Sequence, residues 1–230
     1  MSAVVAGSGS LASGACSFVG GGCGNIASSG FSTVGGGVGN TATSIHSTVS
    51  GGYKNCATCN SAFVGGGVLN ISSGDRAGII AGQQNTSSGG YSIVGGGKGN
   101  TASGYMSTIG GGNLNIATTS YGTVGGGQQN SNCGVKSTIG GGYLNSITSN
   151  NSVIAGGGNN TNSSYSGAIL GGRFNSASGC YTTMGGGCAN TASGNMSVAV
   201  GGTGSLASGN CSFVGGGQSN TSLGPLSSIS

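Results

Sequence analysis

A single 15-residue unit, repeated without insertion or deletion from Met1 to Ser230, constrains the fold of this chain more than any other feature. One copy runs from Asn100 to Leu114, and the next copy begins at Asn115. Positions within the unit are numbered as phases 1 to 15, with phase 1 at the Asn. A fixed short period is typical of architectures in which each repeat contacts only its neighbours.

Phase 1 is occupied by Asn in nearly every unit, and Ser10 and Ser205 are the exceptions. The Asn residues of this column are Asn25, Asn40, Asn55, Asn70, Asn85, Asn100, Asn115, Asn130, Asn145, Asn160, Asn175, Asn190 and Asn220. Stacked carboxamides can form hydrogen bonds along a column of equivalent positions, and Asn also tolerates turn conformations. We therefore expect a structural ladder of Asn side chains along the molecule.

Small and apolar residues occupy the other regular phases. Phase 13 is Gly in every unit, phase 12 is Gly except at Ala6 and Ala81, and phase 10 is apolar throughout. Phases 3 and 8 contain mostly Ala, Ser, Thr or Gly. Gly reaches positive φ and lets another backbone approach closely. The pattern indicates a narrow interior that is filled by about one aliphatic side chain per unit.

These regular runs predict two strands per unit, at phases 1–5 and 8–13, joined by two exposed corners. Helix is excluded because the chain contains 57 glycines, which destabilise helices strongly. We predict an all-β fold, a parallel β-solenoid of about fifteen 15-residue coils, with residues 1–230 forming one domain. Only 3% of residues are charged and none is Trp, so backbone hydrogen bonds between coils must replace a large core.

The variable phases 6, 7, 14 and 15 contain every charged residue and every tyrosine. The charged residues are Lys54, Asp75, Arg76, Lys98, Lys136 and Arg173. The tyrosines, which are the candidate surface contacts, are Tyr53, Tyr91, Tyr105, Tyr121, Tyr143, Tyr165 and Tyr181. The basic residues are scattered and form no stripe, so we expect no nucleic-acid partner.

Catalytic and metal-binding motifs are lacking in the sequence. Asp75 is the one side-chain carboxylate and His46 lies two coils away, so a paired-carboxylate site and a catalytic triad are both excluded. Cys56 and Cys59 have CxxC spacing without a second ligand pair nearby. We expect no enzymatic activity, no catalytic or cofactor-binding residue, no metal site and no cofactor.

The eight cysteines never share a phase in neighbouring units, so the sequence predicts no disulfide ladder and favours a reducing compartment. Pairing of Cys16 with Cys23, or of Cys180 with Cys188, stays open. The N-terminal residues contain no charged segment followed by an apolar one, so we expect no signal peptide. The chain also has no apolar run long enough to insert into a membrane.

Phase 9 contains a column of threonines, which is the arrangement that some ice-binding solenoids use. Its members are Thr33, Thr48, Thr108, Thr123, Thr138 and Thr183. Phe18, Phe63, Ile93, Val153 and Phe213 interrupt the column, which indicates a face that packs against a partner. Ice binding is therefore kept as an alternative.

The segment Ala192-Ser193-Gly194-Asn195-Met196-Ser197, followed by Val198-Ala199-Val200-Gly201, resembles the head repeats of trimeric autotransporter adhesins, the YadA-like head. The resemblance implies a left-handed parallel β-roll, a homotrimer of three rolls side by side, and a role in adhesion. The unit here is one residue longer than the common family unit and has a Gly-Gly-Gly run in place of aliphatic residues. The sequence also shows no stalk, neck or anchor of that family.

These departures favour a fibre or spike subunit, for example of a virus or phage, over a complete adhesin. We expect a structural protein at a virion or cell surface, which reaches it without a signal peptide and whose corners contact a host-surface protein or glycan. An alternative is a filament subunit, because neither end shows a capping segment over its open strand edges.

Overall fold

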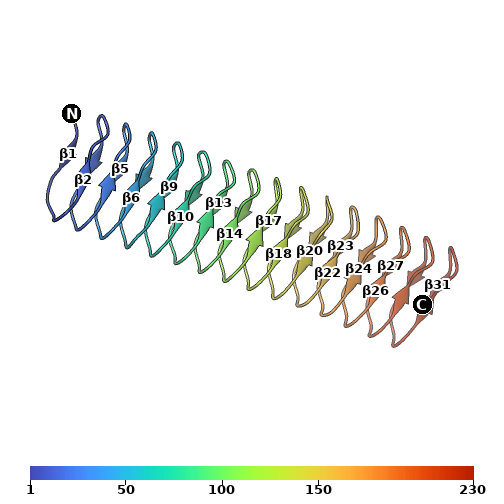
Figure 1. The fold of residues 1–230 in the computed structure, drawn as a ribbon. Coiled ribbons are helices and arrows are strands. Elements are labelled where there is room, and N and C mark those ends of the chain that lie inside the picture. Colours follow the sequence, from blue (N-terminus) through green and yellow to red (C-terminus); the bar gives the residue numbers. More distant parts are fainter. The chain divides into compact units, whose positions relative to one another are not determined.

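The structure is a computed structural model that describes residues 1–230. It consists of short β-strands and contains no helix. The chain divides into two compact units, Met1–Leu114 and Asn115–Ser230, and Figure 1 shows their successive coils in blue to green and in green to red. The structure thus contains no membrane-spanning helix.

Every strand is two residues long. The first unit contains β1 (Ala3–Val4), β2 (Leu11–Ala12), β3 (Phe18–Val19), β4 (Ile26–Ala27), β5 (Thr33–Val34), β6 (Thr41–Ala42), β7 (Thr48–Val49), β8 (Cys56–Ala57), β9 (Phe63–Val64), β10 (Ile71–Ser72), β11 (Gly78–Ile79), β12 (Thr86–Ser87), β13 (Ile93–Val94), β14 (Thr101–Ala102) and β15 (Thr108–Ile109). The second unit contains β16 (Ile116–Ala117), β17 (Thr123–Val124), β18 (Ser131–Asn132), β19 (Thr138–Ile139), β20 (Ser146–Ile147), β21 (Val153–Ile154), β22 (Thr161–Asn162), β23 (Ala168–Ile169), β24 (Ser176–Ala177), β25 (Thr183–Met184), β26 (Thr191–Ala192), β27 (Val198–Ala199), β28 (Leu206–Ala207), β29 (Phe213–Val214), β30 (Thr221–Ser222) and β31 (Ser228–Ile229).

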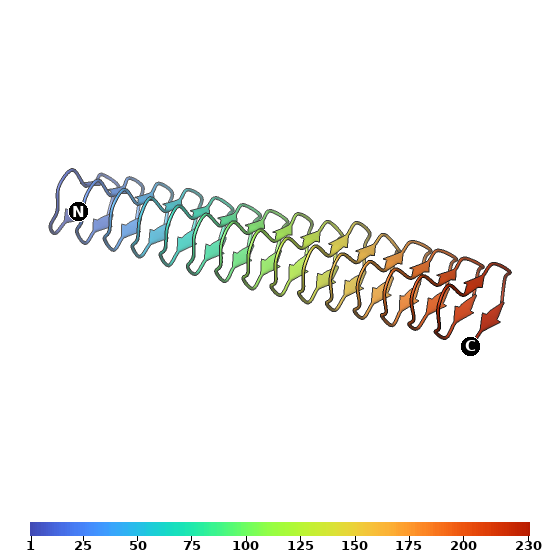
Figure 2. The ribbon, with the colours of Figure 1, turned by 90° about the horizontal axis from the view of Figure 1, so that it is seen from below.

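In each unit the odd-numbered strands form one parallel sheet and the even-numbered strands form another. Figure 2 shows the arrows of the two sheets as separate rows. Paired residues are 15 apart in sequence, as where Thr33 pairs with Thr48 and Val34 with Val49. The predicted parallel β-solenoid of about fifteen coils is therefore confirmed, and its register follows the sequence period.

The strands are shorter than predicted. They occupy only phases 2–3 and 9–10, instead of phases 1–5 and 8–13. A β-turn closes phases 5–8, for example through the Ser32 amide, which donates to the Ser29 carbonyl at 3.2 Å. At phase 13 the glycines have φ between 80° and 117°, which ends the extended backbone. A third line of contact, missed from sequence, is a column of single parallel bridges at phase 14, such as Cys23 to Val38.

The interior consists of the side chains at phases 1, 3, 8 and 10. Phase 10 supplies most of the largest buried side chains, including Ile109, Ile139 and Met184, and Ile147 at phase 3 is an exception. In one place a long side chain is next to a short one in this column, where Met184 pairs with Ala199. Close packing of this kind is expected where an interior is one side chain wide.

Part of the second unit has a polar interior. Asn132 and Asn162 occupy phase 3, where most coils have Ala, and both are fully buried. The Asn162 carboxamide donates to the backbone oxygens of Gly167 at 3.0 Å and Val153 at 3.2 Å. A Cβ at Gly167 would lie 2.5 Å from the Ser164 Cβ atom and 2.8 Å from the Asn162 Oδ1 atom, so a side chain at this phase-8 position would clash with both residues.

Candidate interaction surface

The predicted Asn column lies inside the molecule, where it fastens coils to one another. All of its members are buried except Asn220, which is half-buried. The Asn40 Nδ2 atom donates to the oxygen of Gly36, four residues before it, and to the oxygen of Gly52, twelve residues after it and stacked on Gly37, both at 2.8 Å. Its Oδ1 atom accepts from the amide of Asn55 at 3.0 Å. The column is therefore structural and is not accessible to a partner.

The bonds of this column differ from the expected carboxamide ladder, since most of them join a side chain to backbone. Carboxamides contact each other from Asn100 to Asn85 at 3.1 Å and from Asn130 to Asn115 at 3.2 Å. Instead, the backbone carbonyls at phases 12 and 13 accept the hydrogen bonds that the Asn Nδ2 atom donates. The 15-residue period predicted the position of the Asn column. It did not predict the carbonyl groups that accept from the Asn side chains, because their direction depends on the positive φ at phase 13.

The glycines at phase 13 are needed by the same arrangement. A Cβ on Gly37 would lie 2.2 Å from the Gly52 oxygen and 2.7 Å from the Asn40 Nδ2 atom. Both atoms belong to the hydrogen bond from Asn40 to Gly52. Asn at phase 1 and Gly at phase 13 therefore depend on each other. Ser205 replaces the Asn in one coil, and its buried hydroxyl has no hydrogen-bond partner.

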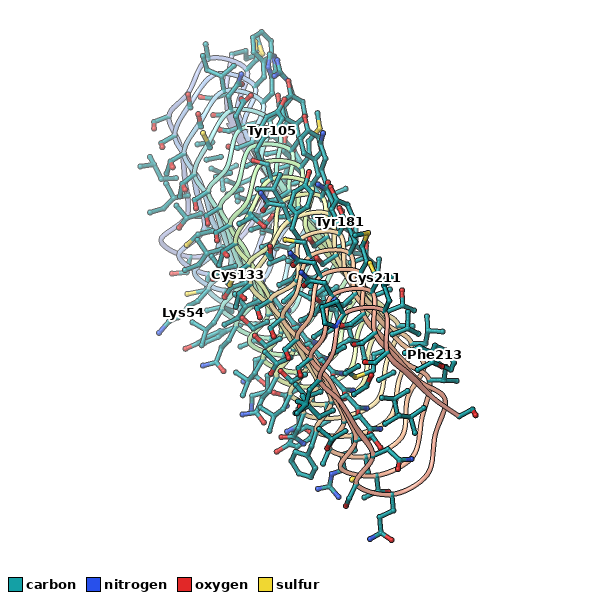
Figure 3. All side chains as sticks on the ribbon, turned by 90° about the vertical axis from the view of Figure 1, so that its right-hand side faces the viewer. Lys54, Tyr105, Cys133, Tyr181, Cys211 and Phe213 are labelled. Atoms are coloured by element: carbon teal, nitrogen blue, oxygen red, sulfur yellow. The ribbon has the colours of Figure 1, made fainter.

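The predicted tyrosines lie at two different corners of the coil. Tyr91, Tyr105, Tyr121, Tyr165 and Tyr181 occupy phases 6 and 7, whereas Tyr53 and Tyr143 occupy phase 14. All of them are exposed. Figure 3 labels Tyr181 and Cys211 along one edge of the second unit, with Phe213 nearby. Phases 6 and 7 form the first corner of each coil, and phases 14 and 15 form the second corner.

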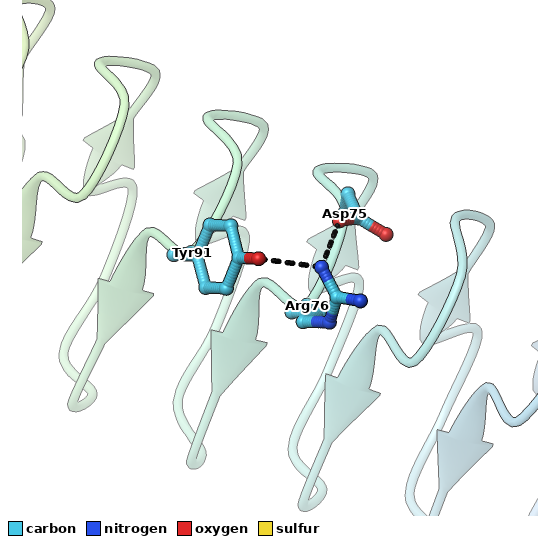
Figure 4. Close-up of polar contacts among 3 residues, drawn as sticks. All are labelled: Asp75, Arg76 and Tyr91. Atoms are coloured by element: carbon cyan, nitrogen blue, oxygen red, sulfur yellow. Dashed lines mark hydrogen bonds and ion pairs between the residues drawn. The ribbon is translucent and has the colours of Figure 1, made fainter.

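In the first unit, the first corner contains a connected polar and aromatic cluster (Figure 4). Arg76 Nη1 lies 2.9 Å from Asp75 Oδ2 and also donates to the Tyr91 hydroxyl. The guanidinium also lies over the Tyr91 ring, with Cζ 5.2 Å from its centroid. The rings of Tyr91 and Tyr105 meet edge to face at 5.7 Å. Since all of these groups are exposed, the ion pair adds little stability and the cluster is available to a partner.

Other aromatic contacts follow the corners. In the second unit the rings of Tyr165 and Tyr181 meet edge to face at 5.8 Å. In the first unit the exposed His46 side chain stacks on Phe31 with ring centroids 5.1 Å apart. At the second corner, the Lys54 ammonium lies 5.1 Å from the Tyr53 ring centroid. Large side chains thus contact one another between neighbouring coils at the first corner and within one coil at the second corner.

The outer faces of the two sheets carry no charged residue. On the odd-strand face, the rings of Phe18 and Phe63 lie over phase-11 glycines, where a Cβ would be 3.3 to 3.4 Å from a ring carbon. These rings interrupt the phase-9 threonines, as the sequence indicated. On the even-strand face, phases 2 and 4 both point outward, and sequence reasoning overlooked their hydroxyl groups. In the second unit these include Ser146, Thr148, Thr161, Ser163, Ser176, Ser178, Thr191 and Ser193.

All eight cysteines are free thiols. Partial burial raises the pKa of the Cys56 thiol above its ordinary value, because desolvation disfavours the thiolate. Cys56 therefore stays protonated to a higher pH than an exposed thiol.

The structure contains no group of three or more His, Cys, Asp or Glu residues that would hold a metal ion.

Comparison with protein-family models and with curated protein sequences finds no match to this chain.

Proposed function

We propose that this chain is a structural β-solenoid subunit of a fibre or spike at the surface of a virion or cell, and that its corners contact the surface to which the particle attaches. The observation that carries the proposal is the uniform fastening of each coil to the next. Backbone pairing at phases 2–3, 9–10 and 14 recurs coil after coil, together with the Asn column. Such repetition gives a stiff support that presents the same outer positions every 15 residues.

The resemblance to YadA-like head repeats supports a homotrimer. The odd-strand face of each unit is uncharged and exposes apolar side chains, including Phe63 and Ile93 in the first unit and Val153 and Phe213 in the second. Patches of this kind mark association surfaces. A narrow interior leaves much apolar area for a neighbouring chain to cover, which would add to stability.

Sedimentation equilibrium of the purified chain tests the trimer. We expect a mass three times the 21.3 kDa of one chain, unchanged on dilution through the micromolar range. A stable monomer would contradict this part of the proposal.

Location is tested separately. Antibodies raised against the folded chain should label intact particles or cells of the source organism. Labelling that requires lysis would exclude a role at an exterior surface.

The even-strand face of the second unit favours one second candidate, ice binding. Its outward phases 2 and 4 carry hydroxyl groups in successive coils, from Ser146 and Thr148 to Thr191 and Ser193. Parallel strands place equivalent groups about 4.8 Å apart, so the hydroxyls repeat regularly along each column. Measurement of thermal hysteresis on the pure chain tests ice binding. The thermal hysteresis should disappear when Thr161 and Thr191 are replaced by Lys. A lack of thermal hysteresis in the unmodified chain would rule ice binding out.

A further inference from the structure

The first corner contains a backbone conformation that its residues do not favour. Phase 7 is the third residue of the β-turn at phases 5–8, and it has φ between 53° and 61° in every coil. A positive φ at this place is the geometry of a type II turn, which calls for Gly or Asn. Asn151 is the one residue of these two types in the column. The others are Cys16, Phe31, His46, Ser61, Arg76, Tyr91, Met106, Tyr121, Lys136, Ser166, Tyr181, Met196, Cys211 and Leu226.

The absence of Gly at phase 7 contrasts with the rest of the chain. Glycine makes up 57 of 230 residues, so a quarter of the positions in any column would be Gly by composition alone. The second corner has an equivalent left-handed position at phase 15, with φ between 51° and 66°, and there Gly does occur, at Gly9, Gly24, Gly39, Gly99 and Gly204. Phases 7 and 15 both adopt a left-handed conformation, which Gly adopts most easily. Gly nevertheless occurs only at phase 15.

The fold does not use these side chains to hold the turn. The turn is held by backbone, since the Tyr91 amide donates to the Asp75 carbonyl of the preceding coil at 2.8 Å, and the Tyr181 amide to the Tyr165 carbonyl at 2.8 Å. The side chains themselves project outward, with Tyr181 58% exposed. Strained positions with retained side chains are characteristic of functional sites. We infer that the side chains of this column serve recognition.

The composition of the first corner indicates the kind of ligand. Tyrosine offers a rigid ring with a hydroxyl at its tip, and amide side chains add adaptable hydrogen bonds. Asn150 and Asn151 lie in the coil before Tyr165, and Asn195 in the coil after Tyr181. Charge is nearly absent, because Asp75 and Arg76 neutralise each other in the first unit and Lys136 is the one charged residue of this corner in the second. A neutral partner rich in hydroxyl groups fits these side chains better than a polyanion does.

We propose that the first corner of each unit is a carbohydrate-binding ridge that takes a neutral polysaccharide along its length. Sugar rings stack on the open tyrosine faces, and their hydroxyl groups bond with the tyrosine hydroxyls and accept from the Asn Nδ2 groups. The Oδ1 atoms of Asn150 and Asn195 are already used, because they accept from the amides of Val135 and Cys180. Coils follow one another about every 4.8 Å, so a linear polymer meets a new side chain in each coil. The proposal rests on the attachment role given above and names its ligand class.

The test compares two triple variants of the full chain that make the same kind of change at the two corners. The ridge variant is Tyr91→Gly, Tyr121→Gly and Tyr181→Gly at phase 7. The control variant is Leu69→Gly, Leu144→Gly and Phe174→Gly at phase 15, where φ is 57°, 53° and 58°. Both sets replace a large side chain by Gly in a left-handed conformation, so both variants should fold as well as the unmodified chain, and thermal unfolding checks this.

Binding is measured by affinity electrophoresis and calorimetry with three neutral probes, namely dextran, laminarin and the hexasaccharide of chitin. We expect the unmodified chain and the control variant to bind at least one probe equally, and the ridge variant to bind it at least tenfold more weakly. The proposal is overturned if no probe binds the unmodified chain, if both variants lose binding alike, or if the ridge variant keeps it. It is also overturned if the ridge variant changes the sedimentation mass, because the column would then be a contact between chains. Failure of binding alone leaves the results for trimer and surface location standing.

Discussion

At the scale of single residues, the paired requirement for Asn at phase 1 and Gly at phase 13 explains most of the regularity of the sequence. The carboxamide needs two carbonyls that turn toward it, and those carbonyls turn only because Gly adopts a positive φ. A side chain on that Gly would occupy the place of the carboxamide nitrogen. Neither residue can therefore change without loss of the hydrogen bonds that the other makes.

Two glycines in one coil distinguish the effect of steric clash on stability from the effect of a positive φ. Gly22 and Gly24 have φ of 89° and 62°, but a Cβ at Gly22 would lie 2.0 Å from the Gly37 oxygen, whereas none of the neighbouring atoms lies within 4 Å at Gly24. We expect Gly22→Ala to lower the free energy of unfolding by about 3 kcal/mol or more. Gly24→Ala should lower it by about 1 kcal/mol, the ordinary strain of a left-handed residue. Urea denaturation measures both, and equal losses would show that φ alone governs the column.

Ser205 is the place where the Asn column can be repaired. Its hydroxyl is buried without a partner, while Asn at the same phase bonds to backbone in neighbouring coils. Ser205→Asn should gain bonds to the oxygens of Gly201 and Gly217 and raise the free energy of unfolding by about 1–2 kcal/mol. Ser193→Asn, at an exposed phase, is the matched control and should change it by less than about 0.5 kcal/mol. A destabilised Ser205→Asn variant would show that this coil has lost the room for a carboxamide.

At the scale of strands and turns, the sequence predicts what is periodic and misses what is local. Spacing alone placed residues 15 apart in register and identified phase 10 as core, because in-register stacking puts equivalent residues in one column. It could not define the strand ends, which depend on the positive φ at phases 7, 13 and 15. Phase 7 gave no signal at all, because residues such as Tyr91 and Met106 do not ordinarily adopt that conformation.

The same gap explains why the two corners were not distinguished from sequence. Both contain variable, mostly polar residues, so both were expected to be exposed turns of one kind. The structure shows a hydrogen-bonded β-turn at the first corner and single parallel bridges at the second. The tyrosines of the first corner and the hydroxyl columns of phases 2 and 4 can be recognised as separate surfaces only from the structure.

Removal of one complete coil tests whether the element is a true repeat. Deletion of residues 41–55 keeps the 15-residue frame, so the remaining coils should stack as before and far-ultraviolet circular dichroism per residue should stay unchanged. Deletion of residues 41–54 leaves one residue too many in a coil, and a slip of one residue turns strand side chains to the opposite face. This second variant should unfold at a markedly lower temperature. Similar melting of the two variants would argue against strict register.

At the scale of the whole molecule, stability is a sum over similar coils, each with one aliphatic side chain and a set of hydrogen bonds to its neighbours. Chains with ordinary globular cores distribute their stability over large apolar side chains instead. Here the core residues are mostly Val, Ile and Ala, and the polar atoms of Asn are buried among them. The central claim is that hydrogen bonds from one coil to the next, made by backbone and by the Asn column, hold the fold together.

The measurement that tests this claim most directly is the free energy of unfolding of Asn55→Ser beside that of Lys54→Ser. Asn55 is buried and donates to the oxygens of Gly51 at 2.9 Å and Gly67 at 2.8 Å, whereas Lys54 is exposed at the adjoining corner. The account predicts a loss of about 2–4 kcal/mol for Asn55→Ser, because buried carbonyls lose their donors, and a change within about 1 kcal/mol for Lys54→Ser. Equal effects from the two substitutions would contradict the claim.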